Sequence, residues 1–145
     1  MRRITATALS LAATTALCLT ATGCDTVTEK AGDIVSTATA AVASAAEEKM
    51  NEVKDGVKAT GDVKAGPTST DGDRTVAEIT AANPKDAAAD YTVMVTFRDA
   101  DGNFLDSVVL NIDGVEPGQS KTGTARSNRT LSGEPTAEIA QALRH

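Results

Sequence analysis

Four oxygen-bearing side chains lie close together in one short segment of the chain: Asp99, Asp101, Asn103 and Asp106. Calcium binds several carboxylate and carbonyl oxygens, and Asp-x-Asp-x-Asn is the order of the first ligands in an EF-hand loop. The pattern then fails, because Gly102 comes two places early and no glutamate follows at the twelfth position. The alternative is a hairpin turn, in which Asp, Gly and Asn supply unusual backbone angles. The segment therefore predicts a turn, with a weak calcium site as the alternative.

The sequence offers no pair of side chains that suits nucleophilic catalysis. Its one histidine is His145, at the last position, where we expect a frayed end. The serines therefore lack a histidine partner of defined position. Paired carboxylates could support an envelope hydrolase, an alternative that any acidic protein permits. We predict that the chain is not an enzyme and uses no cofactor.

Cys24 follows a leader that is first basic, then apolar and finally made of small residues. Arg2 and Arg3 carry the charge, and residues 4–19 are uncharged. This run is shorter than the roughly 20 residues that cross a bilayer, which predicts a signal peptide over residues 1–23. The box Ala21-Thr22-Gly23-Cys24 resembles the lipobox of bacterial lipoproteins, although Leu is commoner than Ala at its first position. That resemblance implies a lipid on the Cys24 sulfur and cleavage before it; the alternative is an ordinary secretory signal with an incidental cysteine.

The positions of the cysteines and the net charge bear on three questions: disulfide bonds, nucleic-acid binding and the way the chain is held at a membrane. Cys18 lies inside the leader and Cys24 is the expected lipid site, so no disulfide is expected. Loss of residues 1–23 removes two arginines and no acids, which leaves 14 − 2 = 12 basic and 20 acidic residues and a net charge of −8. Such a chain is unsuited to nucleic acid and repels anionic headgroups. Acyl chains, not a basic patch, are therefore expected to hold it at the membrane.

The composition changes near residue 60. Residues 24–60 are rich in Ala, Glu and Lys and predict a lipid-anchored helical spacer, with the helix itself over residues 28–57. Apolar residues recur there on one stripe: Ala31, Ile34, Ala38, Val42, Ala45, Met50, Val53 and Val57. The stripe could pack on the following domain, lie on the membrane, or support weak self-association through residues 28–57. We favour a semi-ordered spacer, because alanine buries little area.

Residues 61–145 predict six or seven short strands in an antiparallel sandwich. Tyr91, Val93, Val95 and Phe97 share one face of the clearest strand, which should form a hairpin with residues 104–112. The expected strands are residues 63–65, 75–81, 91–97, 104–112, 120–126 and 136–143, the first of them ended by Gly66-Pro67. The last could instead be a helical turn, and we favour the strand.

The hairpin segment resembles a known family. Residues 91–106 read YTVMVTFRDADGNFLD, and Val-Glu-Pro-Gly follows at 115–118. This alternating strand, Asp-rich turn, second strand and Pro-Gly turn resemble the FxLYD-type domains of bacterial surface lipoproteins over residues 62–126. The whole chain is similar to small actinobacterial lipoproteins, although Phe97-Arg98-Asp99 lacks the family's tyrosine. The resemblance implies an immunoglobulin-like sandwich and no particular activity.

Together these features predict a mainly β protein that a lipid on Cys24 holds on the extracytoplasmic face of the cell membrane. Its sandwich is expected to bind an unknown envelope protein or polymer through a sheet edge or loops, or to have a structural role. The weak calcium-binding or sensing module and the carboxylate hydrolase are the alternatives.

Overall fold

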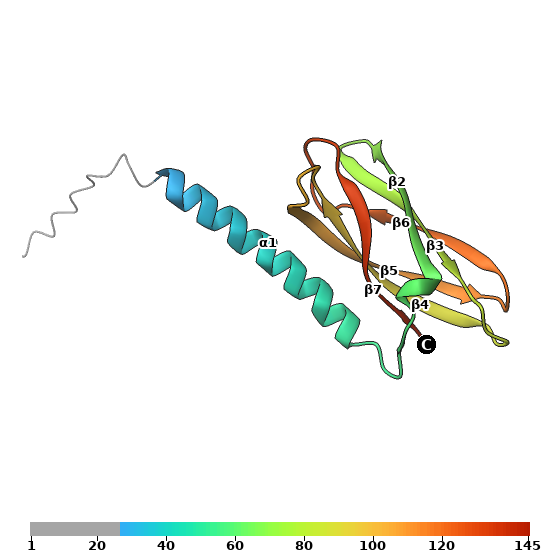
Figure 1. Cartoon of the computed structure of the whole chain (residues 1–145). Helices are drawn as coiled ribbons and strands as arrows, with labels where there is room; N and C mark the ends of the chain where they lie inside the picture. The colour runs from blue at the N-terminus through green and yellow to red at the C-terminus, as the bar shows by residue number, and fades with distance from the viewer. Residues whose placement is uncertain (1–26) are drawn as a thin grey trace, which may run out of the picture.

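The computed structural model describes residues 27–145, with side chains placed from Thr39 onward. One helix precedes seven strands, which form two antiparallel sheets (Figure 1). This arrangement confirms the predicted antiparallel sandwich with a helix before it. In chain order the elements are α1 (Val27–Asn51), β1 (Val57–Lys58), the 3₁₀ helix η1 (Thr60–Asp62), β2 (Val63–Asp71), β3 (Arg74–Ala82), β4 (Ala89–Arg98), β5 (Phe104–Val115), β6 (Ser120–Arg126) and β7 (Thr136–Arg144).

The strands divide between a four-stranded sheet of order β1-β7-β4-β5 and a three-stranded sheet of order β2-β3-β6. After β5 the chain crosses to the second sheet, forms β6 beside β3, and returns to place β7 between β1 and β4. One side of the sandwich therefore has β5 next to β6, and the other has β2 next to β7. β5, β6 and β2 are outermost in their sheets, whereas β7 lies inside the short strand β1, which pairs only with its end.

The core between the sheets is filled by alternate residues of β4, as the period of two predicts. Tyr91, Val93, Val95 and Phe97 are completely buried. They meet apolar residues of the other strands, among them Ile79, Ala81, Ile112, Ala125 and Ala142. The predicted hairpin is confirmed, because β4 pairs with β5 along its length.

Tyr91 is the sole tyrosine of the chain, and its hydroxyl donates a hydrogen bond to the carbonyl oxygen of Ala82 at 3.2 Å. Burial raises the pKa of the Tyr91 phenol, and this effect exceeds the opposing effect of the hydrogen bond with Arg144. The folded state therefore keeps the phenol neutral at a pH where the unfolded chain already ionises it.

We expect the stability of the protein to fall as the pH rises above the ordinary tyrosine pKa of about 10. A raised folded-state pKa gives a contribution that is complete below the unfolded-state pKa and is lost as the pH rises through the folded-state value. Tyr91→Phe should abolish this slope and cost about 1 kcal/mol at neutral pH through the lost hydrogen bond. Urea unfolding at a series of pH values measures both, and an unchanged alkaline slope in the variant contradicts the assignment.

Strand β2 is longer than the sequence predicts. Gly66-Pro67 was expected to end it, but the strand continues to Asp71 and its register with β3 shifts between Ala65 and Thr68. The bulge absorbs Pro67, which has no N–H to donate to a ladder. The predicted strand over 136–143 is confirmed as β7, because pairing with β4 and β1 outweighs its helix-like composition.

The helix prediction was wrong at its C-terminal end, because α1 stops at Asn51. Asp55 has a φ of 58°, and Val57 and Lys58 pair with β7 as strand β1. The sheet thus begins inside the predicted spacer. Gly56 makes the close approach possible, since a Cβ there would lie 3.2 Å from the Cβ of Leu143.

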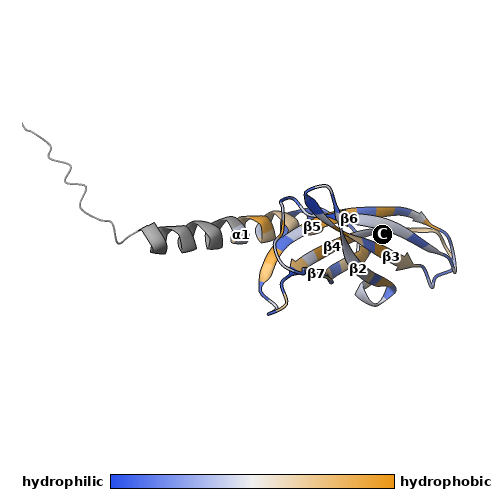
Figure 2. Ribbon diagram, turned by 90° about the horizontal axis from the view of Figure 1, so that it is seen from above, coloured by the Kyte–Doolittle hydropathy of each residue, from blue (hydrophilic) through white to orange (hydrophobic). Residues whose placement is uncertain are grey.

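The C-terminal half of α1 packs on β5 and β4 (Figure 2). The N-terminal half of the helix extends beyond the sandwich (Figure 1). Ala46 and Met50 are buried, while Ala45, which we placed in the stripe, is exposed. A semi-ordered spacer is therefore the wrong description of this half, which is a packed layer of the domain. Self-association through residues 28–57 stays a prediction. Within the described residues, no helix has the length and apolar character needed to cross a membrane.

Candidate functional site

Two hollows flank the last turns of α1, where the helix lies over β5. The first, of about 490 Å³, is bounded by α1, by residues 107–110 of β5 and by residues 124–126 of β6. The second, of about 510 Å³, lies under the end of the helix. Lys49 and Val109 line both hollows, so they meet there. We call the two hollows together the edge groove.

The first hollow is lined mainly by small apolar side chains. Val42, Ala45 and Ala46 of α1 form one wall. Four consecutive residues of β5 and three of β6 form the others, and consecutive residues point to both faces of a strand. The groove therefore runs along the edges of these two strands rather than over one face of a sheet.

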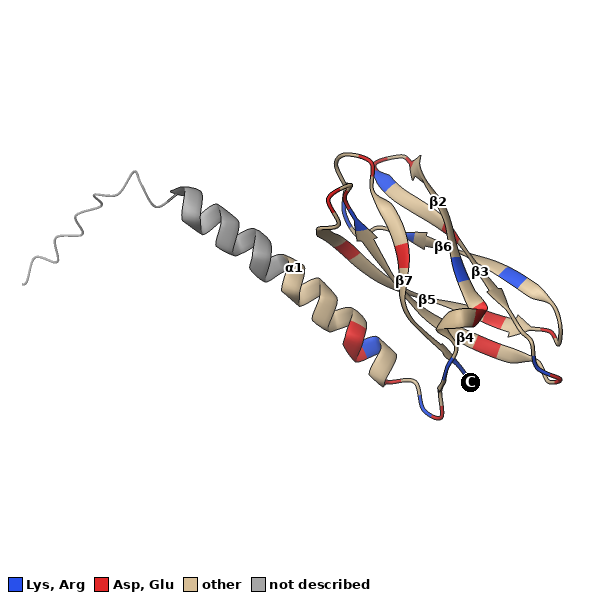
Figure 3. Cartoon of the chain, viewed as in Figure 1, with Lys and Arg blue, Asp and Glu red and all other residues tan. Residues whose placement is uncertain are grey.

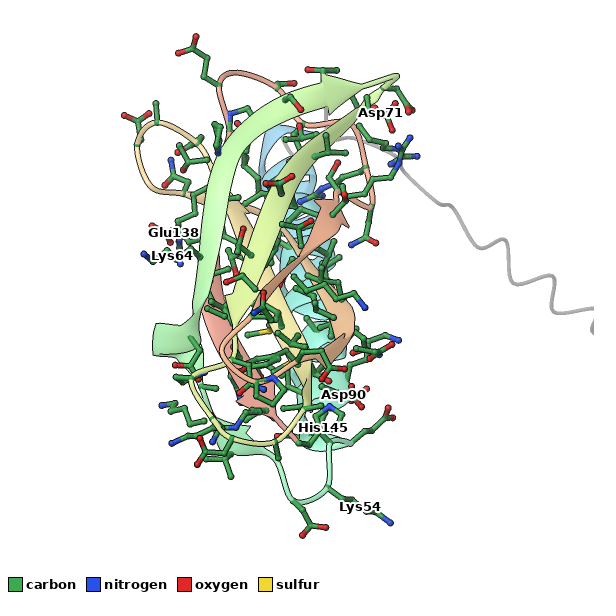
Figure 4. The ribbon with its side chains drawn as sticks, turned by 90° about the vertical axis from the view of Figure 1, so that its right-hand side faces the viewer. Lys54, Lys64, Asp71, Asp90, Glu138 and His145 are labelled. Carbon is green, nitrogen blue, oxygen red and sulfur yellow. The ribbon has the colours of Figure 1, made fainter. Side chains whose placement is uncertain are left out.

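The second hollow is polar and contains the end of the chain. The backbone of His145 exchanges two hydrogen bonds of 3.0 Å with Asp90, and the two residues lie together at one end of the sandwich (Figure 4). His145 Nε2 lies 3.1 Å from Thr92 Oγ1, which in turn donates to Asn111 Oδ1 at 3.1 Å. The expectation of a frayed histidine was wrong, because His145 continues the ladder between β7 and β4.

Two lysines give the edge groove positive charge in an acidic chain. Lys49 and Lys54 line it and form no ion pair with any described residue. Elsewhere arginines pair with acids: Arg74–Asp73, Arg98–Glu138, Arg126–Asp71 and Arg144–Asp62. Charged residues of both signs are otherwise spread over strands and loops (Figure 3). Lys49 is therefore available to pair with a carboxylate that enters the groove beside Val109. The second hollow also has one acidic side chain in its lining, that of Glu52.

The turn between β4 and β5 uses three of the four predicted metal ligands for its own structure. The Asp99 carboxylate accepts hydrogen bonds from the backbone N–H of Asp101 at 2.9 Å and of Asn103 at 2.8 Å, and from the Asn103 side chain at 3.0 Å. The Asn103 side-chain amide, followed by its backbone N–H, lowers the pKa of Asp99 below the ordinary value. Gly102 has a φ of 83°. The prediction of a turn is confirmed.

Asp106, the fourth predicted ligand, points away from this turn. It is completely buried and accepts hydrogen bonds from the N–H of Ser107 at 2.9 Å and of Asn128 at 2.6 Å, and from the Asn128 side chain at 3.2 Å. The structure therefore does not bring Asp99, Asp101, Asn103 and Asp106 together. Over the described part of the chain, no cluster of three or more His, Cys, Asp or Glu residues could hold a metal ion.

Cys24 lies outside the described residues, and its lipidation stays a prediction. Sequence reasoning missed Ala46, Lys49, Val109 and Asn111 as parts of a groove. The spacing of four between Ala46 and Met50 could have located the packed face of α1. No local signal marks Val109 and Asn111, because which strand lies at the edge of a sheet depends on the order of all the strands.

Comparison with known proteins does not assign the chain to a family. No protein-family model matches the chain, and no curated protein matches it. A crystal structure of a DUF1425 family member from Shewanella sp. pv-4 is similar over 53% of this chain and 73% of that one, with 19% identity and a TM-score of 0.32. This likeness says nothing about what the present chain binds, and the resemblance to FxLYD-type domains stays a prediction.

Proposed function

We propose that this chain is a lipid-anchored protein of the cell envelope, whose sandwich is a non-catalytic binding module. Cys24 is the anchored residue, and the extracytoplasmic face of the cell membrane is the location. The observation that carries the proposal is the position of α1. The helix begins three residues after Cys24, extends beyond the sandwich, and then packs on it beside the edge groove (Figure 1).

The helix gives the module both reach and a fixed attachment. Its 25 residues span about 37 Å at 1.5 Å per residue. Because the last turns bury Ala46 and Met50 against the domain, the sandwich is held on the helix and not merely tethered by it. An anchor before Val27 therefore displays the groove away from the bilayer surface.

The character of the hollows supports a binding role over hydrolysis. A hydrolase of the carboxylate type needs two facing carboxyl groups. The first hollow has no carboxylate side chain in its lining, the second has Glu52, and a third, of about 320 Å³ beside η1, has Asp62. Asp62 is already paired with Arg144. The calcium alternative loses support for a different reason, because Asp99 and Asp106 are occupied by N–H groups.

The anchor can be tested by mass spectrometry and membrane fractionation of the chain expressed in a bacterial host. We expect a mature N-terminus at Cys24 that carries a diacylglyceryl group, and recovery of the chain with the membranes. Cys24→Ser should abolish cleavage and lipidation, whereas Cys18→Ser, a matched change inside the leader, should leave both unchanged. An unmodified Cys24 thiol on a chain recovered in the soluble fraction would contradict the proposal.

The display of the sandwich outside the membrane is tested separately. Protease added to intact cells after removal of the outer layers should degrade the sandwich if it is displayed there.

A further inference from the structure

Alternate residues of β5 turn their backbone N–H and C=O away from β4, toward the edge groove. Ser107 fixes the alternation, because its carbonyl oxygen accepts a hydrogen bond from the Asn128 side chain at 3.0 Å. In an antiparallel strand the N–H and C=O of one residue point to the same side, and the side alternates along the strand. Val109, Asn111 and Asp113 therefore point outward with Ser107. The pairing of Asp90 with His145 agrees, since it assigns the even-numbered residues of β4 to β7 and the odd-numbered ones to β5.

The two ends of this outer edge are closed by side chains, and its centre is open. Arg129 donates to the carbonyl oxygen of Leu105, Asn128 to that of Ser107, and Lys121 to that of Asp113 at 2.6 Å. Between them, the outward N–H groups of Val109 and Asn111 donate no hydrogen bond to any described residue, and their C=O groups accept none. Val109 is half-buried and Asn111 is exposed. These four backbone groups form a short stretch of unpaired strand edge.

The opposite side of the sandwich has features that hinder strand addition at particular positions. There β2 carries the bulge at Pro67, which cannot donate to a further strand. β1 covers the end of β7, and Thr68 Oγ1 donates to the carbonyl oxygen of Pro135 at 2.5 Å beside its start. These features hinder strand addition at the bulge of β2 and at the two ends of β7, whereas the centre of the β5 edge lies beside the edge groove.

We propose that an extended segment of a partner protein adds to the sheet beside β5 and pairs with the backbone of Val109 and Asn111. The proposal deepens the proposed function and rests on its binding role. Alternate apolar side chains of the segment enter the first hollow against Val42 and Ala46, and an acidic side chain reaches the Lys49 ammonium. Backbone pairing of this kind supplies affinity, while the pockets on either face supply specificity.

Charge complementarity favours a partner segment over a second copy of the chain. A second copy offers the same open edge, and its residues 108–111 have no acidic side chain to meet Lys49. With the proposed cleavage before Cys24, the segment before α1 is also a poor candidate: three residues then precede Val27, and 15 residues of helix, roughly 22 Å, separate Val27 from Val42. The groove therefore suits an acidic, partly apolar peptide from another molecule.

The test uses a display library of random peptides selected on the full-length chain as the producing cell processes it. Enriched peptides should alternate apolar residues and contain an acidic one. Val109→Pro removes one outward N–H and no bond to β4, and should weaken the binding of a selected peptide about tenfold, the value of one hydrogen bond of about 1.4 kcal/mol. Val109→Thr keeps the N–H and is the matched control, with affinity expected to stay within about threefold. Lys49→Glu should weaken binding to a similar extent as Val109→Pro.

Several results would overturn the proposal. They are failure to enrich any peptide, equal affinity for Val109→Pro and the unaltered chain, or insensitivity to Lys49→Glu. Concentration-dependent dimerisation that Val109→Pro abolishes would assign the edge to a second copy instead. Amide exchange of β4 shows whether Val109→Pro is folded, and Asn111→Pro provides a second edge variant. Because the N-terminal mass reports lipidation separately, loss of peptide binding and failure of the anchor are distinguishable.

Discussion

Replacing Asp106 with alanine is expected to lower the free energy of unfolding by about 3 kcal/mol. The carboxylate is completely buried and accepts three hydrogen bonds, from Ser107 and from the backbone and side chain of Asn128. Its removal leaves these donors facing an apolar side chain, so each loses its partner without gaining water. The segment after β6 should detach at the same time, because Asn128 is held through Asp106. Urea denaturation gives the free energy, and amide exchange of residues 127–129 gives the local effect.

Asp106→Asn and Asp71→Ala provide the controls. Asp106→Asn keeps one acceptor oxygen but places an amide against an N–H donor, and should fall between the alanine variant and the unaltered chain. Asp71 is exposed and pairs with Arg126, so its replacement by alanine should cost at most about 1 kcal/mol. Similar losses for Asp106→Ala and Asp71→Ala would show that burial of the Asp106 network does not matter.

Met50→Ala is expected to weaken the docking of α1 by about 2 to 3 kcal/mol. Met50 is 1% exposed and is among the largest completely buried side chains of the protein. The neighbouring buried residue of the helix is Ala46, which contributes little area, so Met50 provides most of the apolar contact of this face. Amide exchange should accelerate over residues 42–51 while β4 and β7 keep their protection.

Glu48→Ala is the matched change on the exposed face of the same turn, and should alter stability by less than about 0.5 kcal/mol. If Met50→Ala leaves the exchange of α1 unchanged, the helix is held by something other than this side chain. Loss of α1 docking should also remove one wall of the edge groove and so weaken the peptide binding proposed above.

The sandwich was predictable where burial alternates along a strand. Strand β4 is predictable because every second residue of it is apolar and enters the core: Tyr91, Val93, Val95 and Phe97. The turn at Asp99 was predictable for a similar local reason, because Asp, Gly and Asn satisfy its backbone without distant contacts. Local signals also located β3, β5 and β6 to within a few residues.

The remaining features depend on contacts between distant parts of the chain. The sequence around Pro67 predicts the end of a strand, because the bulge forms only through pairing with β3. The sequence around Val57 predicts a helix, because the strand there depends on pairing with Arg144 of β7. The position of His145 predicts a frayed end, because its order depends on pairing with Asp90 of β4. The edge groove is the extreme case, because Val109 is open only by virtue of β5 being outermost in its sheet.

The inner place of β7 determines when this protein can fold. The strand follows all the other described strands in the chain, yet it lies between β1 and β4 and pairs with both. While residues 136–144 are still inside a ribosome or a translocation channel, β1 has no neighbour and β4 has one unpaired edge. Such long-range pairing makes folding slow and leaves apolar strands exposed meanwhile. The four-stranded sheet is therefore completed only after β7 has emerged.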